Sequence, residues 1–221
     1  MKYDLNTIKT YVINLDRRTD RLQSLVIPFK WERFSAFDAV KVGEMGYVGC
    51  LNSHRTVLEQ ALELKLESVL IFEDDVELCD DFETKFYNIV SKLPEDWDLL
   101  YLGGWNRGTI KKYADGLDVA ENVVCMHAYF VNGKFLQTAV NALHSKDGIQ
   151  KEPNDYKCDV LLAESLLKGK CFICNPTLAW QREGYSDIEN ITTNNLHLKD
   201  PTKKAIIIPT NNIGTTFNIK L

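Results

Sequence analysis

Short apolar runs alternate along the chain with longer stretches in which apolar residues recur every three or four positions. The runs are typical of buried strands and the stretches of amphipathic helices. Strands are predicted at 10–15, 34–40, 69–72, 98–104, 123–131 and 171–180. Helices are predicted at 16–26, 51–66, 82–93 (ending before Pro94), 135–143 and 159–168, the first capped by Asp16. This alternation predicts an α/β fold, a mixed but mainly parallel sheet with helices on both faces.

The remaining segments are polar and are predicted to be irregular. Two loops are expected at 106–118 and 145–157, where glycines and polar residues interrupt the periodic pattern. The tail after residue 190 carries one short apolar run at 205–208 and is otherwise unassigned. With 221 residues and no internal repeat, the chain is expected to form a single domain, 1–221, with a core at about 8–190 and a tail at 191–221.

Three consecutive acids, Glu73, Asp74 and Asp75, follow the apolar run at 69–72. That run is typical of a central strand buried on both faces, and open α/β sheets bind their ligands at the carboxyl ends of strands. Adjacent carboxylates repel one another, so a cation, a helix N-terminus or arginines must compensate them. Mg²⁺ and Mn²⁺ prefer such oxygen ligands and often share them with substrate phosphates. The alternative is that these acids cap the next element and face water.

Other clusters contain side chains suited to a phosphate or a sugar. Asn14, Arg17, Arg18 and Arg21 follow the first strand, and arginine forks pair well with phosphate oxygens; a solvated helix face is the alternative. Ser53 and His54 lie where a glycine-rich segment enters a helix, and either could bind a ligand or be structural. Asp159 is a functional candidate or an ordinary helix cap. The polar and aromatic segment 180–188 would suit sugar binding.

Composition and charge reduce the classes of partner and of function that remain possible. The formal charge of −5 argues against nucleic acid as the main partner. No apolar run approaches the ~20 residues that span a bilayer, and the N-terminus lacks a signal-peptide core, so a cytoplasmic protein is expected. The six cysteines are expected to be free thiols. Cys171 and Cys174 are expected to be buried in a strand, because a zinc site would need a second pair at matching spacing.

The order of motifs resembles that of glycosyltransferase family 25, which includes lipopolysaccharide-type galactosyltransferases and the collagen β-galactosyltransferase domain. The resemblance covers roughly residues 8 to 190. Its segments in chain order are Tyr11–Leu22, Gly46–His54, Val69–Val76, Asp96–Gly103, Ala128–Val131, Asp159 and Gln181–Ile188.

The resemblance implies a GT-A-type nucleotide-binding fold and inverting transfer of a hexose, galactose or glucose, from a UDP-sugar to a glycan or another hydroxylated acceptor. It implies Mn²⁺ or Mg²⁺ as cofactor, with Asp75 as main ligand assisted by Glu73 or Asp74. It assigns the catalytic base to Asp159. The residues it places at or beside the nucleotide are Asn14, Leu15, Arg17, Arg18, Arg21, Ser53, His54 and Asp74.

Two other classes of function remain open. A metal-dependent phosphohydrolase or nucleotidyltransferase also uses acids after a strand, although Glu73–Val76 lacks the Asp-x-Asp pattern of aspartyl phosphohydrolases. A family member that binds a nucleotide or glycan without transferring a sugar is the second alternative. The sequence leaves the oligomeric state and the identity of the acceptor open.

Overall fold

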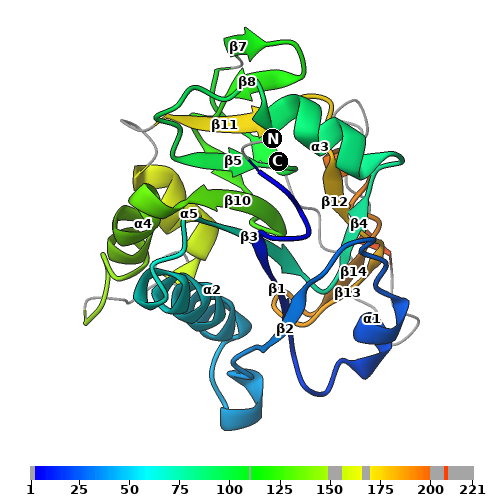
Figure 1. Ribbon diagram of the computed structural model, residues 1–221. Coiled ribbons are helices and arrows are strands. Elements are labelled where there is room, and N and C mark those ends of the chain that lie inside the picture. Colours follow the sequence, from blue (N-terminus) through cyan, green and yellow to red (C-terminus); the bar gives the residue numbers. More distant parts are fainter. Residues whose placement is uncertain (1–2, 110, 149–155, 166–169, 200–206, 209–221) are drawn as a thin grey trace.

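The fold is built on one eight-stranded mixed sheet (Figure 1). The computed structural model describes residues 3–109, 111–148, 156–165, 170–199 and 207–208. The strands follow the spatial order β2 (Glu32–Ser35), β1 (Lys9–Asn14), β3 (Ser68–Glu73), β10 (Ala128–Asn132), β5 (Leu99–Tyr101), β11 (Cys171–Cys174), β8 (Leu117–Val119) and β7 (Lys111–Ala114). The pairings make β10 and β8 antiparallel to the other strands. The expected mixed, mainly parallel sheet is therefore confirmed.

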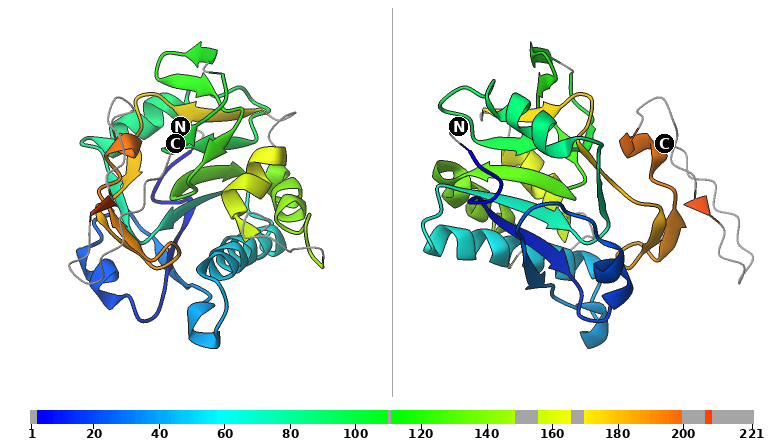
Figure 2. Two further views of the ribbon diagram at one scale, coloured as in Figure 1. Left: turned by 180° about the vertical axis from the view of Figure 1, so that it is seen from behind. Right: turned by 45° about the vertical axis from the view of Figure 1, so that its right-hand side comes forward.

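Helices cover both faces of this sheet, as the two views of Figure 2 show. One face packs against α2 (Gly46–Glu63), α4 (Leu136–Leu143) and α5 (Cys158–Ser165), and the other against α3 (Phe82–Val90). A hydrophobic core lies on each face of the sheet, and strand β1 contributes side chains to both. Tyr11 and Ile13 enter the first core, whereas Val12 enters the second, because successive side chains of a strand point to opposite faces. This arrangement is consistent with the GT-A-type fold that the resemblance implies.

Helix α2 begins at Gly46, earlier than the predicted residue 51. The glycines that suggested a loop lie inside its first turns because the helix packs closely on neighbouring backbone. A Cβ at Gly49 would lie 2.4 Å from the Phe37 carbonyl oxygen, and one at Gly46 would lie 2.8 Å from Ile188 Cα. The sequence pattern does not distinguish such a close approach from a loop.

The predicted loop at 106–118 is wrong, because most of its described residues are paired. Strand β7 forms a hairpin with β8 at the edge of the sheet, and β6 (Trp105–Asn106) pairs with β9 (Val123–Val124). Leu117 is fully buried, and the Asp118 carboxylate accepts a hydrogen bond of 2.6 Å from Asn175. One buried leucine among many polar residues gave too weak a periodic signal.

Several predicted elements are shorter than expected or are divided. The run 123–131 is broken between β9 and β10, where Cys125 has a φ of 71°. The run 34–40 is reduced to the end of β2, followed by the 3₁₀ helix η1 (Val40–Val42). Helix α1 spans only Thr19–Ser24, with Arg18 at its N-cap position. Asp16 is not its cap; its carboxylate instead accepts a hydrogen bond from Ser35 at 2.8 Å.

The C-terminal segments form small sheets beside the main one. The run 171–180 is divided into β11 and β12 (Ala179–Gln181), and β12 pairs with β4 (Val76–Leu78). Strands β13 (Gly184–Ser186), β14 (Ile191–Thr193) and β15 (Ile207–Ile208) form an antiparallel sheet. The chain also contains α6 (Leu196–Lys199) and η2 (Gly133–Phe135). Of the predicted run 205–208, only residues 207–208 (β15) are among the residues that the structure describes. Residues 149–155 of the predicted loop 145–157 lie outside the described residues.

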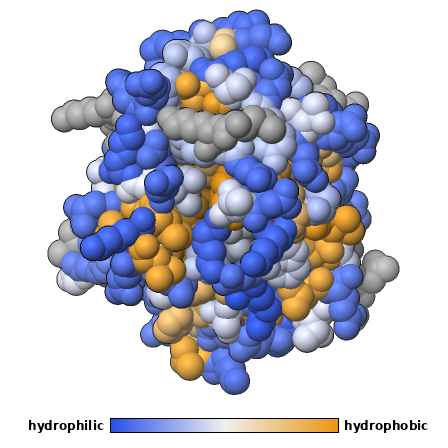
Figure 3. Space-filling view, viewed as in Figure 1, coloured by the Kyte–Doolittle hydropathy of each residue, from blue (hydrophilic) through white to orange (hydrophobic). Residues whose placement is uncertain are grey.

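Hydrophilic residues cover much of the surface in the view of Figure 3, with apolar patches between them. Exposed apolar side chains cluster around η1, where Val42 is 72% exposed and Phe37 58%. In the part of the chain that the structure describes, no helix combines the length and the apolar character that crossing a membrane would require.

Candidate active site at the carboxyl end of strand β3

The acids after β3 lie beside the polar end of β1, because these strands are parallel neighbours. Ile13 is paired with Glu73 in the β1–β3 register. The next residue, Asn14, is buried, and its Nδ2 atom donates a hydrogen bond of 2.7 Å to Asp74 Oδ2. The two clusters therefore meet at one edge of the sheet.

Asp74 is held from several sides by groups of opposite polarity. Besides the bond from Asn14, its Oδ1 accepts a hydrogen bond of 2.7 Å from Arg21 Nη1. Its backbone carbonyl accepts another, of 2.9 Å, from Arg182. Only 5% of Asp74 is exposed, and it does not line the cleft described below. Asp74 therefore joins β3 to α1 and to the segment after β12.

Glu73 is fixed by two side chains. Its Oε1 lies 3.1 Å from His54 Nε2, and its Oε2 accepts a hydrogen bond of 3.1 Å from Gln181. Burial alone would raise the pKa of Glu73, but the contact with His54 outweighs it and lowers this pKa. The other ring nitrogen of His54 lies 2.9 Å from the Tyr129 hydroxyl. The structure thus places His54 behind Glu73, where it positions the carboxylate.

Asp75 differs from both neighbours because one of its oxygens has no partner. Its Oδ2 accepts a long hydrogen bond of 3.2 Å from Arg21, whereas its Oδ1 is buried and unbonded among the described residues. Burial, and then the nearby charge of Glu73, raise the pKa of Asp75 to about 7. An unpaired buried acceptor is costly, so this site is poised for a cation or a hydrogen-bond donor.

Glu73 and Asp75 open onto a cleft of about 1400 Å³. Of the residues predicted to bind ligands, five line it: Arg18, Arg21, Glu73, Asp75 and Asp159. The others predicted beside the nucleotide do not line it: Asn14, Leu15, Arg17, Ser53, His54 and Asp74. Trp105 and His197 also line the cleft and meet edge to face, with ring centroids 6.1 Å apart.

The arginines of the first cluster are ion-paired to the C-terminal segment. Arg17 and Arg18 both bond the Asp187 carboxylate, Arg17 at 2.6 Å. Arg21 also donates a hydrogen bond of 2.6 Å to the Tyr185 carbonyl. Segment 182–193 is thereby held against the carboxyl ends of β1 and β3. Leu15 contributes only its carbonyl oxygen to this turn, which accepts a bond from the Arg18 amide at 2.9 Å.

Asp159 lies across the cleft as the second residue of α5. Its Oδ2 accepts a hydrogen bond of 3.0 Å from the Cys125 amide, and its Oδ1 one of 2.8 Å from Val160. It is thus inside the helix and not at its cap. These two amides fix the orientation of the carboxylate, which is partly exposed to the cleft.

Ser53 has a structural role in this arrangement. Its hydroxyl donates to the Gly49 carbonyl at 2.7 Å and accepts from the Phe37 amide at 2.8 Å, so helix α2 is joined to the segment before η1. Sequence reasoning missed Tyr129 and treated 180–188 only as a candidate sugar-binding segment. The antiparallel pairing of β10 with β3, which brings Tyr129 opposite Ile71, is not visible in the pattern of apolar residues.

Fold and site together define an α/β protein with a mixed, mainly parallel sheet and an acid-lined cleft at the carboxyl end of a central strand. Residues 43–146 match the family model of glycosyltransferase family 25, described as a lipopolysaccharide biosynthesis protein. These findings, with the curated relatives below, confirm that the chain is related to glycosyltransferase family 25.

The matches to individual proteins are partial. The chain is 26% identical over 133 residues to a glycosyltransferase 25 family member of Anopheles gambiae, covering 46% of this chain and 22% of that protein. It is 33% identical over 61 residues to human procollagen galactosyltransferase 2 and 42% identical over 65 residues to the human inactive glycosyltransferase 25 family member 3. Each match covers 26% of this chain and 10% of the relative. The chain therefore spans less than a quarter of the length of these relatives.

Among solved structures, a glycosyltransferase involved in glycosylation of the major capsid of PBCV-1 is similar with a TM-score of 0.44 and 11% identity. That match covers 76% of this chain and 91% of the other.

Proposed function

We propose that this protein is an inverting, metal-dependent glycosyltransferase that moves a hexose, galactose or glucose, from a UDP-sugar to a hydroxyl of a glycan or another acceptor. The observation that carries the proposal is the free, buried Oδ1 atom of Asp75, in a cleft shared with Glu73 and Asp159. The relationship to glycosyltransferase family 25 supports it, since that family includes a procollagen galactosyltransferase.

The acids at this edge suit a hard divalent cation. Carboxylate oxygens are the ligands that Mn²⁺ and Mg²⁺ favour, and one oxygen of Asp75 has no competing bond from any residue that the structure describes. Both Glu73 oxygens already have partners, so Asp75 would be the main ligand and Glu73 an assisting one. Asp74 is the weakest candidate because its oxygens bond Asn14 and Arg21. When bound, the metal would neutralise charge on the departing diphosphate.

Side chains of the cleft would supply the other parts of the reaction. Arg18 and Arg21 would face the diphosphate, for which guanidinium groups are well suited. Asp159 would accept the proton of the acceptor hydroxyl. The oxygen of that hydroxyl would at the same time bond the anomeric carbon of the donor sugar as the bond from this carbon to UDP breaks. The backbone amides of Cys125 and Val160 would keep that carboxylate oriented toward the cleft.

The deciding experiment measures UDP release from a panel of UDP-sugars, with Mn²⁺ or with EDTA, for wild type and Asp75→Asn. We expect release from one or two donors that needs the metal and falls by about 10²–10⁴ in the variant. The matched control is Asp80→Asn, because Asp80 is an exposed acid of the same strand–helix connection. Equal release from wild type and Asp75→Asn, or release unaffected by EDTA, would contradict the proposal.

A second candidate is a protein that binds UDP or a glycan without transfer. It is favoured by the similarity to a human family member named as inactive. Calorimetry with UDP, with and without Mn²⁺, separates the two candidates when it is combined with the release assay. Metal-dependent UDP binding with no release from any donor, even with acceptor glycans present, would support this second candidate.

A further inference from the structure

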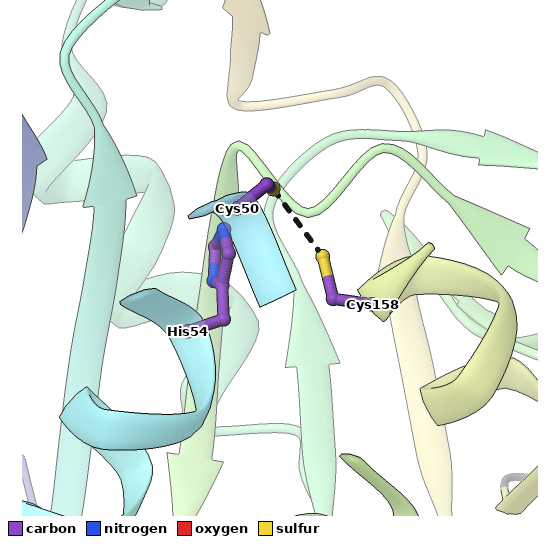
Figure 4. A group of neighbouring side chains, drawn as sticks. All are labelled: Cys50, His54 and Cys158. Carbon is purple, nitrogen blue, oxygen red and sulfur yellow. Dashed lines mark hydrogen bonds between the residues drawn. The ribbon is translucent and has the colours of Figure 1, made fainter. Parts of the chain in front are cut away.

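Two cysteines face each other at the wall of the cleft. Cys50 comes from α2 and Cys158 is the first residue of α5, and their sulfur atoms are 3.5 Å apart (Figure 4). Both residues line the cleft. Cys171 and Cys174, by contrast, are buried in β11 as the sequence predicts. The pair at the cleft was not anticipated, because its members are more than a hundred positions apart.

The surroundings of Cys50 favour its thiolate form. The hydrogen bond from the Cys158 thiol lowers the pKa of Cys50 to about 7, and His54, one helical turn further along α2, lowers it too. Thiolates are the nucleophilic form of cysteine, and their reactivity requires access to a reagent. Cys50 is partly exposed, whereas Cys158 is buried directly behind it. The geometry thus combines an accessible, ionisable thiol with a second thiol within reach.

A metal ion is a weaker explanation for the same cluster. One ligand atom each from Cys50, His54 and Cys158 lie within 4.8 Å of one another, close enough to suggest a thiolate–imidazole site. Both ring nitrogens of His54 are already engaged, however, one by the Tyr129 hydroxyl and the other by Glu73. Binding a metal through His54 would break one of those contacts, whereas joining the two sulfurs breaks neither.

We propose that Cys50 and Cys158 are a redox-responsive thiol pair that closes to a disulfide on exposure to a peroxide and reopens with a small thiol reductant. The Cys50 thiolate attacks one oxygen of hydrogen peroxide, and the O–O bond breaks. The attacked oxygen stays on the sulfur as a sulfenic acid, and the other oxygen leaves as hydroxide and is protonated to water. The Cys158 sulfur then loses its proton and attacks the Cys50 sulfur. The oxygen of the sulfenic acid leaves as a second water. The two thiols thereby lose two electrons and two protons, and the peroxide is reduced to two water molecules.

Closing this disulfide would disturb both walls of the candidate active site. The sulfur atoms must approach from 3.5 Å to about 2.05 Å. Asp159 directly follows Cys158, and His54, which positions Glu73, follows Cys50 by one helical turn. Oxidation should therefore lower sugar transfer by roughly 10²-fold, the cost of misplacing a reacting group by about 1 Å. This consequence rests on the proposed function, whereas disulfide formation does not.

The test treats the full chain with hydrogen peroxide, blocks remaining thiols with iodoacetamide and maps the peptides by mass spectrometry. We expect a peptide pair joined through Cys50 and Cys158 that disappears with dithiothreitol and is absent from Cys50→Ser and Cys158→Ser. The matched control is Cys79→Ser, because Cys79 is also partly exposed but burial raises its pKa. That variant should still form the linked pair. Circular dichroism checks that each variant is folded, and Cys50→Ala replaces any serine variant that is not.

Two results would overturn the proposal. One is the absence of the linked pair while Cys50 is oxidised or alkylated alone. The other is stoichiometric zinc in wild type that Cys50→Ser loses, which would make the cluster a metal site. If the linked pair forms but UDP release is equal before and after oxidation, the inhibitory consequence is wrong. If the linked pair forms but neither the reduced nor the oxidised protein releases UDP from any donor, the proposed function is wrong and the proposal of a redox-responsive thiol pair is still supported.

Discussion

Asp74 and Asp75 are neighbours in the sequence but belong to two different regions of the molecule. Asp74 lies on the arginine side, formed by Asn14, Arg21 and the segment 182–193, where its two carboxylate oxygens accept hydrogen bonds. Asp75 lies on the cleft side, with Glu73 and Asp159, and one of its oxygens is buried without a bond to the described part of the chain. The same residue type therefore serves architecture at one position and is available for chemistry at the next.

This difference shows that charge alone does not identify a site. On the arginine side the acids are matched by cations from the same chain, so no ligand is needed to balance them. On the cleft side one oxygen of Asp75 has no partner among the described residues, and the pKa of Asp75 is raised to about 7 by burial and by Glu73. Uncompensated acids in a cleft are the usual sign of a functional site.

The largest effect is expected from Asp159, on the cleft side. Asp159→Asn should lower the rate of transfer by about 10²–10⁴, because an amide cannot accept the proton of the acceptor hydroxyl. The matched control is Glu164→Gln, an exposed acid in the same helix, which should change the rate little. The measurement is kcat for UDP release with acceptor present, together with Kd for UDP. Unchanged kcat in Asp159→Asn would remove Asp159 from the base role.

The next effect is on stability and belongs to the arginine side. Asp74→Ala should lower the free energy of unfolding by about 3–5 kcal/mol, because it leaves the partly buried guanidinium of Arg21 without its closest carboxylate and leaves Asn14 without its acceptor. Asp75→Ala should cost much less, since Asp75 Oδ1 has no hydrogen bond to lose. Urea unfolding of metal-free protein measures both, with the exposed Asp80→Ala as control.

If Asp74→Ala and Asp75→Ala destabilise the protein equally, the two acids are not divided between architecture and chemistry. If Asp75→Ala lowers the free energy of unfolding more than Asp74→Ala does, Asp75 and not Asp74 has the structural role. In either case Asp75 could no longer be singled out as the acid that is free for a ligand.

The sequence predicted the parts of this site that depend on single strands. The apolar run 69–72 followed by three acids located β3 and the edge that carries the candidate site, and the run before Asn14 located β1 beside it. Parallel neighbours bring their carboxyl ends together, so the meeting of the two clusters follows from the fold class. The family resemblance added Asp159, which no pattern in the chain would have separated from a helix cap.

What the sequence could not predict are pairings between distant segments. The sequence predicted that the arginines bind a phosphate, which stays a prediction for Arg18 and Arg21, but it did not indicate that Arg17 and Arg18 both bond Asp187, about 170 positions away. His54 read as a ligand-binding residue, but burial against Tyr129 and Glu73 makes it a support. The hairpin at β7 and β8 was missed because edge strands carry few apolar side chains. Each of these features depends on a contact set by tertiary structure.

The smallest effect concerns the link between the arginine side and the C-terminal segment. Burial would raise the pKa of Asp187, but hydrogen bonds from Arg17 and Arg18 more than offset this and lower it. A carboxyl whose pKa is lower in the folded state stabilises the protein above the unfolded pKa of about 4. That stabilisation is lost as the pH falls through the folded pKa.

Asp187→Asn should therefore lower the free energy of unfolding by about 1–2 kcal/mol at pH 6. The difference from wild type should shrink below pH 4, where the wild-type carboxylate becomes protonated as well. Urea unfolding at a series of pH values measures this, with Asp115→Asn as control because the Asp115 side chain is 91% exposed. A difference that is constant with pH would mean that Asp187 acts through shape and not through charge. Packing, and not ion pairs, would then hold the arginine side together. Electrostatics would no longer explain the difference between the arginine side and the cleft side.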